Sequence, residues 1–247
     1  MEAHVEASTS ISVYLAAVLL KLGTYGILRY ILPIFPIGVA QLQSFILTLA
    51  ILGIIYTSLT CLTLWDIKKY IAYSSISHMN LALLGLFSQN YIGISSSIYF
   101  MISHGIISSG LFLLVGILYD RYHTRILLYY RGLVLILPLY VLILGIFTFA
   151  NIAFPLTSGF ISEILTFLSL IHFNPFLTIL ASLAIILTPM YALFFFHQIS
   201  YGKLSPHIFP HLDITRKEFA LLLPLILFVI LLGIYPNMIF NLILFNS

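Results

Sequence analysis

Long apolar stretches recur along the chain and are separated by short polar segments. Each of these stretches is close to or beyond the length of about 20 mostly apolar residues that a membrane-spanning helix needs. They cover residues 12–31, 41–63, 67–88, 92–119, 133–172, 176–200 and 219–245. The pattern predicts an all-α, polytopic membrane protein with about seven transmembrane helices, folded as a single membrane domain over residues 1–247.

The fifth segment, 133–172, is too long for one crossing and carries the sequence FPLTSG at 154–159. Proline removes a backbone donor and clashes with the preceding turn, and glycine adds conformational freedom. We interpret the segment as one broken helix, with half-helices at about 133–153 and 160–172 joined by an unwound stretch. Unwound backbone at membrane depth is typical of transport sites. The alternative is one long tilted helix with a proline kink.

Composition supports the membrane assignment and excludes several classes of protein. Of 247 residues, 62% are apolar and only 7% are charged, whereas soluble domains carry about 25% charged residues. The single cysteine, Cys61, excludes an intrachain disulfide, and no Cys/His cluster has the spacing of a metal or iron–sulfur site. No nucleotide-binding or catalytic-triad motif is present, so we expect no metal and no cofactor in this chain.

The distribution of basic residues predicts the orientation. Seven crossings place the segments 64–67, 120–132 and 201–218 on one side, and eight basic residues flank or lie in them: Lys68, Lys69, Arg121, Arg125, Arg131, Lys203, Arg216 and Lys217. The opposite loops, near 32–40, 89–91 and 173–175, hold no Lys or Arg, although Arg29 is close to the first. The positive-inside rule then puts the N-terminus inside and the C-terminus outside.

Four ionisable residues are predicted to lie inside the membrane. Lys21, His78 and His104 are each near the middle of a predicted span, roughly 15 Å from either end at 1.5 Å per residue, and Glu163 follows the predicted break. A charge at the bilayer centre is expensive, so such residues are functional candidates. Histidine exchanges protons near neutral pH, and a row of such groups at one depth is what lateral proton transfer requires.

Each of these residues also has a plainer interpretation. Lys21 could extend to the membrane interface, either histidine could be a neutral core residue, and Glu163 could be protonated against the break. Asp66 beside Lys68 and Lys69 is expected to form a solvated ion pair. The shared depth of the four groups favours a proton relay over these separate explanations.

The same stretches resemble a known family. They are AHVEA at 3–7, LLKLG at 19–23, DIKKYIAYSSISHM at 66–79, HG at 104–105, YDRYHTR at 119–125 and GFISE at 159–163. In this order they resemble chain 4 of proton-pumping NADH:ubiquinone oxidoreductase (complex I), an antiporter-like subunit family. That family has an inverted-repeat fold of fourteen helices, and the seven spans here resemble its second half.

The resemblance implies a function and a location. It implies that Lys21, His78, His104 and Glu163 form the polar axis of a proton channel, and that FMN, iron–sulfur clusters and quinone belong to other subunits. It also implies the mitochondrial inner membrane, with the N-terminus in the matrix and the C-terminus in the intermembrane space. The acidic start of the chain, without Lys or Arg, is unlike a cleavable targeting signal.

The first seven helices of the family have no counterpart here, and Ser8 stands where the family usually has proline. We expect a split subunit, in which a separate polypeptide supplies the missing N-terminal helices and packs against the first two spans. Other membrane-arm subunits and membrane lipids, including anionic lipids on the basic side, are the remaining expected partners. Two alternatives are a cation/proton antiporter or hydrogenase membrane subunit, and a structural scaffold that does not pump.

Overall fold

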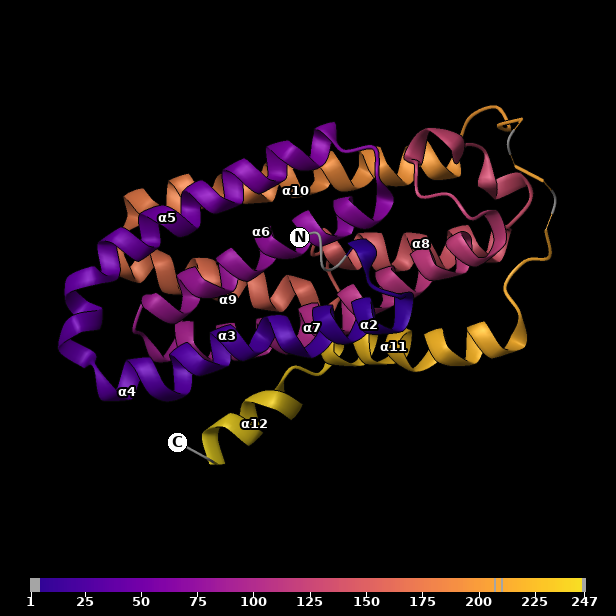
Figure 1. Ribbon diagram of the computed structural model, residues 1–247. Helices are drawn as coiled ribbons and strands as arrows, with labels where there is room; N and C mark the ends of the chain where they lie inside the picture. Colours follow the sequence, from indigo (N-terminus) through magenta and orange to yellow (C-terminus); the bar gives the residue numbers. More distant parts are fainter. Residues whose placement is uncertain (1–4, 207, 210, 246–247) are drawn as a thin grey trace.

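The computed structural model describes residues 5–206, 208–209 and 211–245, so residues 3 and 4 of the AHVEA stretch lie outside it. The described chain is an elongated bundle of roughly parallel and antiparallel helices (Figure 1). Its elements are α2 (Thr9–Tyr14), η1 (Leu15–Leu19), α3 (Leu20–Gly26), η2 (Ile27–Ile31), α4 (Leu32–Ile34), α5 (Pro36–Thr63), α6 (Ile67–Phe87), α7 (Tyr91–Tyr122), η3 (Leu127–Tyr129), η4 (Leu133–Leu135), α8 (Pro138–Asn151), α9 (Ser158–Phe173), α10 (Pro175–Ser200), α11 (Arg216–Ile234) and α12 (Asn237–Phe245).

The first span, Thr9–Ile34, is helical throughout and contains two π-helical turns. The turns η1 and η2 flank α3, and a π turn leaves a backbone carbonyl without its usual i+4 donor. The loop predicted near 32–40 is almost absent, because α4 runs to Ile34 and α5 begins at Pro36. Proline lacks a backbone N–H and is favoured in a first turn, so the chain turns at Phe35 and a new helix starts at once.

α6 and α7 form the interior of the bundle, and most of their residues are buried. α6 begins where the Asp66 carboxylate accepts hydrogen bonds from the backbone of Lys68 and Lys69, at 2.9 and 3.3 Å. The pair approaches closely near the other end, where a Cβ on Gly93 would collide with Ser88 and with the Gly85 carbonyl. Small residues therefore allow the two backbones to touch, as they do in other membrane helix pairs.

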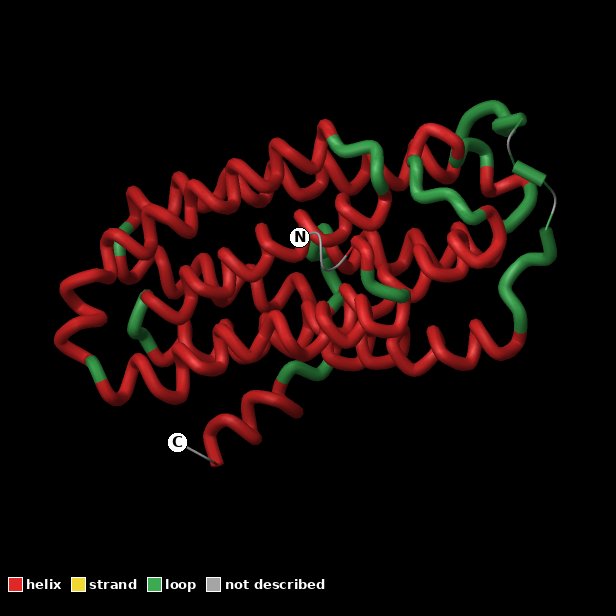
Figure 2. The backbone as a smooth tube through the Cα atoms, viewed as in Figure 1, coloured by secondary structure: helices red, strands yellow, loops and turns green. Residues whose placement is uncertain are grey.

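The predicted broken helix is present (Figure 2). α8 ends at Asn151, α9 begins at Ser158, and two residues between them, Ala153 and Leu156, have positive φ angles of 61° and 75°. The break therefore starts two residues earlier than the sequence predicted. α8 also begins later than predicted, at Pro138, because residues 133–135 form the short turn η4 and Leu137 has a non-helical conformation (φ −126°, ψ 65°).

The last predicted span, 219–245, is wrong as a single helix. α11 ends at Ile234, Tyr235 has a non-helical conformation (φ −124°, ψ 68°), and α12 leaves the bundle at an angle after Pro236 (Figure 1). Pro236 has no N–H to continue the helix, and the residue before a proline disfavours the α conformation. Beside this end of α11, Gly233 packs so closely on the break that an added Cβ would collide with the Leu156 carbonyl.

The three basic loops meet at one end of the bundle. Backbone hydrogen bonds join Ile67 N to Arg125 O (3.0 Å), Leu127 N to Trp65 O (2.6 Å) and Gly132 N to Tyr201 O (3.2 Å). The start of the chain lies at the same end, because the Arg125 guanidinium donates to Val5 O at 2.6 Å. This arrangement matches the predicted grouping of the basic segments on one side.

Within the described residues, five helices are long and apolar enough to cross a membrane: Thr9–Ile34, α5, α7, α10 and α11. α8 and α9 are shorter apolar helices, as expected for the halves of one broken span. α6 is less apolar because Ser74, Ser75, Ser77 and His78 occupy its middle. The predicted all-helical polytopic membrane architecture with one broken helix is confirmed.

Candidate functional site: a buried row of ionisable side chains

Lys21 lies at the start of α3, directly after the π turn η1, and is 8% exposed. Its ammonium donates a hydrogen bond to the carbonyl of Ala16, five residues earlier in that turn. The π turn thus supplies an acceptor for a lysine that is buried away from water. On its other side, Lys21 Nζ lies 2.9 Å from His104 Nδ1. Lys21 therefore links the first span to α7.

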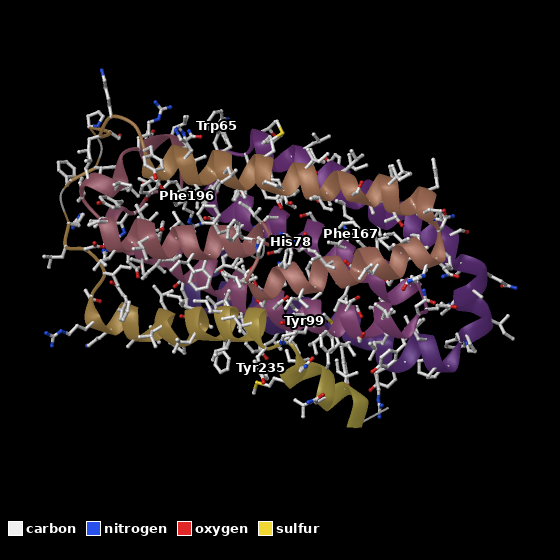
Figure 3. All side chains as sticks on the ribbon, turned by 180° about the vertical axis from the view of Figure 1, so that it is seen from behind. Trp65, His78, Tyr99, Phe167, Phe196 and Tyr235 are labelled. Carbon is white, nitrogen blue, oxygen red and sulfur yellow. The ribbon has the colours of Figure 1, made fainter. Side chains whose placement is uncertain are left out.

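The two histidines come from the two interior helices. His78 is in the middle of α6 and His104 in the middle of α7, and they are 4% and 3% exposed. Their ring centroids lie 5.5 Å apart. Figure 3 shows His78 in the middle of the bundle, far from Trp65 and the loop end. The Nε2 atom of His78 is buried and has no hydrogen-bond partner among the described residues.

Glu163 is in the second turn of α9, just after the break, and is 8% exposed. Its Oε1 atom lies 3.8 Å from His78 Nδ1. This distance is too long for a direct hydrogen bond, although it is short enough for one bridging water. The helix break thus brings a carboxyl group from a third element to the histidine pair.

A small cavity of about 10 Å³ lies among these groups. It is bordered by His78, His104 and Glu163, and by two polar side chains that the sequence did not single out, Ser103 and Asn151. A volume of this size is near the minimum for one water molecule, and the lining offers it several polar partners. Asn151 could have been noticed in the sequence, because it is a buried amide immediately before the break.

The four predicted residues are therefore brought together in one row, in the order Lys21, His104, His78, Glu163. Each neighbour in the row comes from a different helix, and every member is buried. Hydroxyl groups lie beside the row, with Ser103 Oγ 3.5 Å from Ser162 Oγ and Ser77 Oγ 3.4 Å from the Tyr191 hydroxyl. Neutral or charged, these groups can pass protons among themselves and along hydroxyls or water.

Several other charged residues cap helices or join the loops at the basic end. Asp66 was expected to form an ion pair, whereas its carboxylate caps α6 through backbone N–H groups. Arg121 pairs with Glu218 at 2.8 Å across α7 and α11, a contact that sequence spacing could not reveal. In the loop after α7, burial raises the pKa of the Tyr130 hydroxyl, and its hydrogen bond from Thr124 acts in the opposite direction.

Within the described part of the chain, no group of three or more His, Cys, Asp or Glu side chains is placed to hold a metal ion. The row of four residues holds two histidines and one carboxylate together with a lysine, and the amine of the lysine occupies one histidine nitrogen. The row is therefore suited to proton exchange and gives no basis for a metal centre.

The sequence profile of the NADH:quinone oxidoreductase/Mrp antiporter transmembrane family matches residues 1–188. NADH-ubiquinone oxidoreductase chain 4 of Chondrus crispus is 49% identical over 247 residues, which are 100% of this chain and 50% of the relative. The chain thus spans about half the length of the curated relatives it matches.

Solved structures share the fold. One chain in the structure of respiratory complex I from Thermus thermophilus with bound NADH matches with a TM-score of 0.84 and 32% identity, covering 90% of this chain and 47% of that chain. A chain of the Mrp complex from Dietzia sp. matches with a TM-score of 0.87 at 19% identity, covering 96% of this chain and 52% of that chain. The second likeness, at this low identity, concerns the fold alone.

Proposed function

Because this chain belongs to the NADH:quinone oxidoreductase/Mrp antiporter transmembrane family, we propose that it is the C-terminal half of a chain 4 subunit in a proton-pumping NADH:ubiquinone oxidoreductase. In this role it forms one half-channel of the membrane arm. The observation that carries the proposal is the buried row Lys21, His104, His78, Glu163, in which the first contact is 2.9 Å and the last is 3.8 Å. Redox chemistry takes place in other subunits, which hold FMN, the iron–sulfur clusters and quinone.

The order of the row suggests the path of the proton. A proton enters from the basic, matrix side and reaches Lys21, whose ammonium faces His104 Nδ1. It passes from His104 to His78, whose rings lie side by side, and then to Glu163 through the one-water cavity. A change of charge in a neighbouring subunit then shifts the proton affinities, and Glu163 releases its proton toward the intermembrane space.

Protein dipoles and hydrogen bonds replace water around each charged form in this path. Lys21 as an ammonium is held by the Ala16 carbonyl of the π turn. His78 is adjacent to the Glu163 carboxyl group, so a proton on either is stabilised by the other. Since a lone buried charge is costly, protons move along the row with few changes in net charge.

The first half of the family fold, which this chain does not span, is proposed to pack against the first two spans. The outer faces of Thr9–Ile34 and α5 expose many large apolar side chains, among them Tyr14, Leu22, Tyr30, Leu42, Phe45 and Leu52. An open apolar groove of about 550 Å³ beside Lys21 lies along the first span. A helix from that first half would cover the groove and isolate Lys21 from lipid.

We place the assembled subunit in the mitochondrial inner membrane, since the Chondrus crispus relative is an NADH-ubiquinone oxidoreductase chain. The basic loop end and the N-terminus face the matrix by the positive-inside rule. The C-terminus faces the intermembrane space.

Glu163→Gln tests the relay, because glutamine keeps the shape and removes the exchangeable proton. The complex should assemble, oxidise NADH and translocate fewer protons per NADH oxidised in reconstituted vesicles. Glu6→Gln, an exposed carboxylate at the start of the chain, is the matched control and should leave the ratio unchanged. An unchanged ratio in an assembled Glu163→Gln complex would remove the relay role and favour a scaffold.

A native separation in mild detergent tests the assignment to the complex. The chain should migrate in the NADH-oxidising band, and mass spectrometry of that band should also find the helices of the family's first half. If it is absent from every such band, the antiporter interpretation becomes the stronger one. Sodium-dependent proton transport by the purified protein would then be the decisive measurement.

A further inference from the structure

A second site lies at the basic loop end, far from the buried row. A cavity of about 340 Å³ opens there between the 64–66 turn, the loop after η3 and the end of α10, and its lining includes Trp65, Arg131, Phe194, His197, Gln198 and Tyr201. A second cavity of about 440 Å³ adjoins it, shares Leu128 and Arg131, and adds Lys203. Figure 3 shows Trp65 and Phe196 at this end of the bundle, beside the loop that follows α10. We call the two cavities the loop pocket.

We propose that the loop pocket binds the headgroup of an anionic glycerophospholipid that carries a free hydroxyl, such as phosphatidylglycerol. This site does not depend on the proton relay, and failure of one proposal leaves the other standing. Three properties of the pocket carry it: charge, apolar surface and an unpaired buried acceptor.

The charge of the pocket is positive and uncompensated. Arg131 and Lys203 line it, and His197 lies at its edge, whereas no Asp or Glu is part of the lining. Neither Arg131 nor Lys203 forms an ion pair within the described residues. Two acidic residues of this end have other partners, since Asp66 caps α6 and Glu218 pairs with Arg121. A phosphodiester would supply the missing counter-charge.

The pocket also reaches from water into the membrane. Arg131 and Lys203 belong to loops, whereas Phe194 lies two turns inside α10 and is half exposed on its outer face. Trp65 and Tyr201 are about half exposed between these levels, where aromatic rings are favoured at the membrane interface. Cations above, aromatic rings between and an apolar wall below match a phospholipid, with the headgroup in the cavity and an acyl chain along α10.

The lining contains one buried polar atom without a partner. The Oε1 atom of Gln198 has no hydrogen bond among the described residues and almost no exposed surface. An unpaired acceptor of this kind is unfavourable unless a ligand donates to it. A rotation of the Gln198 side chain into the cavity would expose this oxygen, and the glycerol hydroxyl of phosphatidylglycerol, a few bonds from the phosphate that the cations would hold, is a donor for it.

Binding in the pocket can be distinguished from a general attraction of the basic loops for anions. Two other cations on the same side, Arg216 and Lys217, are also exposed but begin α11 and do not line the pocket. The pair Arg131 and Lys203 can therefore be compared with Arg216 and Lys217 at identical change in charge.

The test uses the intact complex, purified in neutral detergent and stripped of lipid. The complex is mixed with phosphatidylcholine vesicles that contain labelled phosphatidylglycerol, and the label that it retains after re-purification is measured. Arg131→Gln with Lys203→Gln removes two charge-assisted hydrogen bonds to the phosphate and should weaken phosphatidylglycerol retention roughly a hundredfold or more. Arg216→Gln with Lys217→Gln should change it several-fold at most. Equal loss in both pairs, or no loss in the first, would overturn the site.

A second lipid tests the hydroxyl. Phosphatidylmethanol has the same charge as phosphatidylglycerol and lacks the glycerol hydroxyls, so the wild-type complex should retain it less well. Gln198→Leu should abolish that preference while the retention of phosphatidylmethanol stays unchanged. If the wild-type complex binds the two lipids equally, the pocket recognises only the charge of the headgroup and the proposed headgroup is wrong.

Discussion

α7 and α11 are both apolar helices, yet they have opposite surroundings. In the most apolar window of α7, 78% of the residues are buried inside the chain, whereas in that of α11 only 17% are. α7 carries the polar residues, among them His104 and a series of serines that donate to carbonyls three residues earlier. α11 carries exposed leucines and phenylalanines. The inner helix of this pair carries the polar groups and the outer helix is almost wholly apolar, because the solvent around α11 is lipid.

The difference has a physical cause. Lipid tails are as apolar as leucine, so moving leucine from lipid to the interior gains little. A polar side chain must find its partners within the protein, since none exist in the hydrocarbon. The interior is therefore held by close packing of small residues and by hydrogen bonds. The same property makes the interior a possible path for protons.

The largest effect on proton pumping should come from substitutions in the first span, which carries one buried cation and one exposed cation. Lys21 is buried beside His104, and Arg29, eight residues later, is exposed on the same helix. Lys21→Met should leave the complex assembled and abolish the protons contributed by this channel, because it removes the first group of the row. Arg29→Met should leave pumping near the wild-type value.

The proton-to-NADH ratio in reconstituted vesicles measures both variants, and a native gel checks their assembly. Equal pumping by the two variants would show that the buried position of Lys21 does not identify a residue of the proton channel. A loss in Arg29→Met alone would place the entry of protons at the opposite end of the first span.

The row of charged residues was largely predictable from the sequence, and its detailed contacts were not. Lys21, His78, His104 and Glu163 are isolated polar residues in apolar runs, so their burial at one depth follows from helix rise alone. Their order depends on which helices touch, and the sequence does not encode this locally. Asn151 was missed because an amide is a weaker signal than a charge.

The next effect concerns packing and uses two adjacent residues of α11. Leu222 is fully buried and Leu221 is 61% exposed. Leu→Ala in a soluble core costs about 2–5 kcal/mol, of which part is transfer from water and part is the cavity left behind. Since lipid replaces water here, the cavity term remains, and Leu222→Ala should destabilise by about 2 kcal/mol. Leu221→Ala should change stability by a few tenths of a kcal/mol at most.

Thermal unfolding of the purified complex, followed by the loss of this chain from the native band, gives the ranking. Equal destabilisation would mean that Leu221 is covered by a neighbouring subunit. Cross-linking from position 221 would then identify the covering chain.

The helix ends show where prediction from sequence fails. The break in the fifth segment was expected from proline and glycine together, and only its edges moved. The break at Tyr235–Pro236 was missed because the apolar run continues through it, and hydropathy does not register a missing N–H. The turn at Phe35 was predicted as a long loop for the related reason that isoleucine and proline around it look neither helical nor polar.

The smallest effect concerns a single hydrogen bond that repairs this second break. Pro236 cannot donate to the carbonyl of Leu232, four residues earlier, and the Tyr99 hydroxyl of α7 donates to that carbonyl instead at 2.5 Å. Tyr99→Phe keeps the ring, which stacks on Phe240, and leaves a buried acceptor unpaired, so it should cost about 1 kcal/mol. Tyr91→Phe, on the same helix but 55% exposed, should change stability much less. Denaturation midpoints of the two variants in the same detergent measure the difference. Equal midpoints would mean that water reaches the Leu232 carbonyl. The end of α11 would then be solvated, unlike the buried interior that α7 occupies.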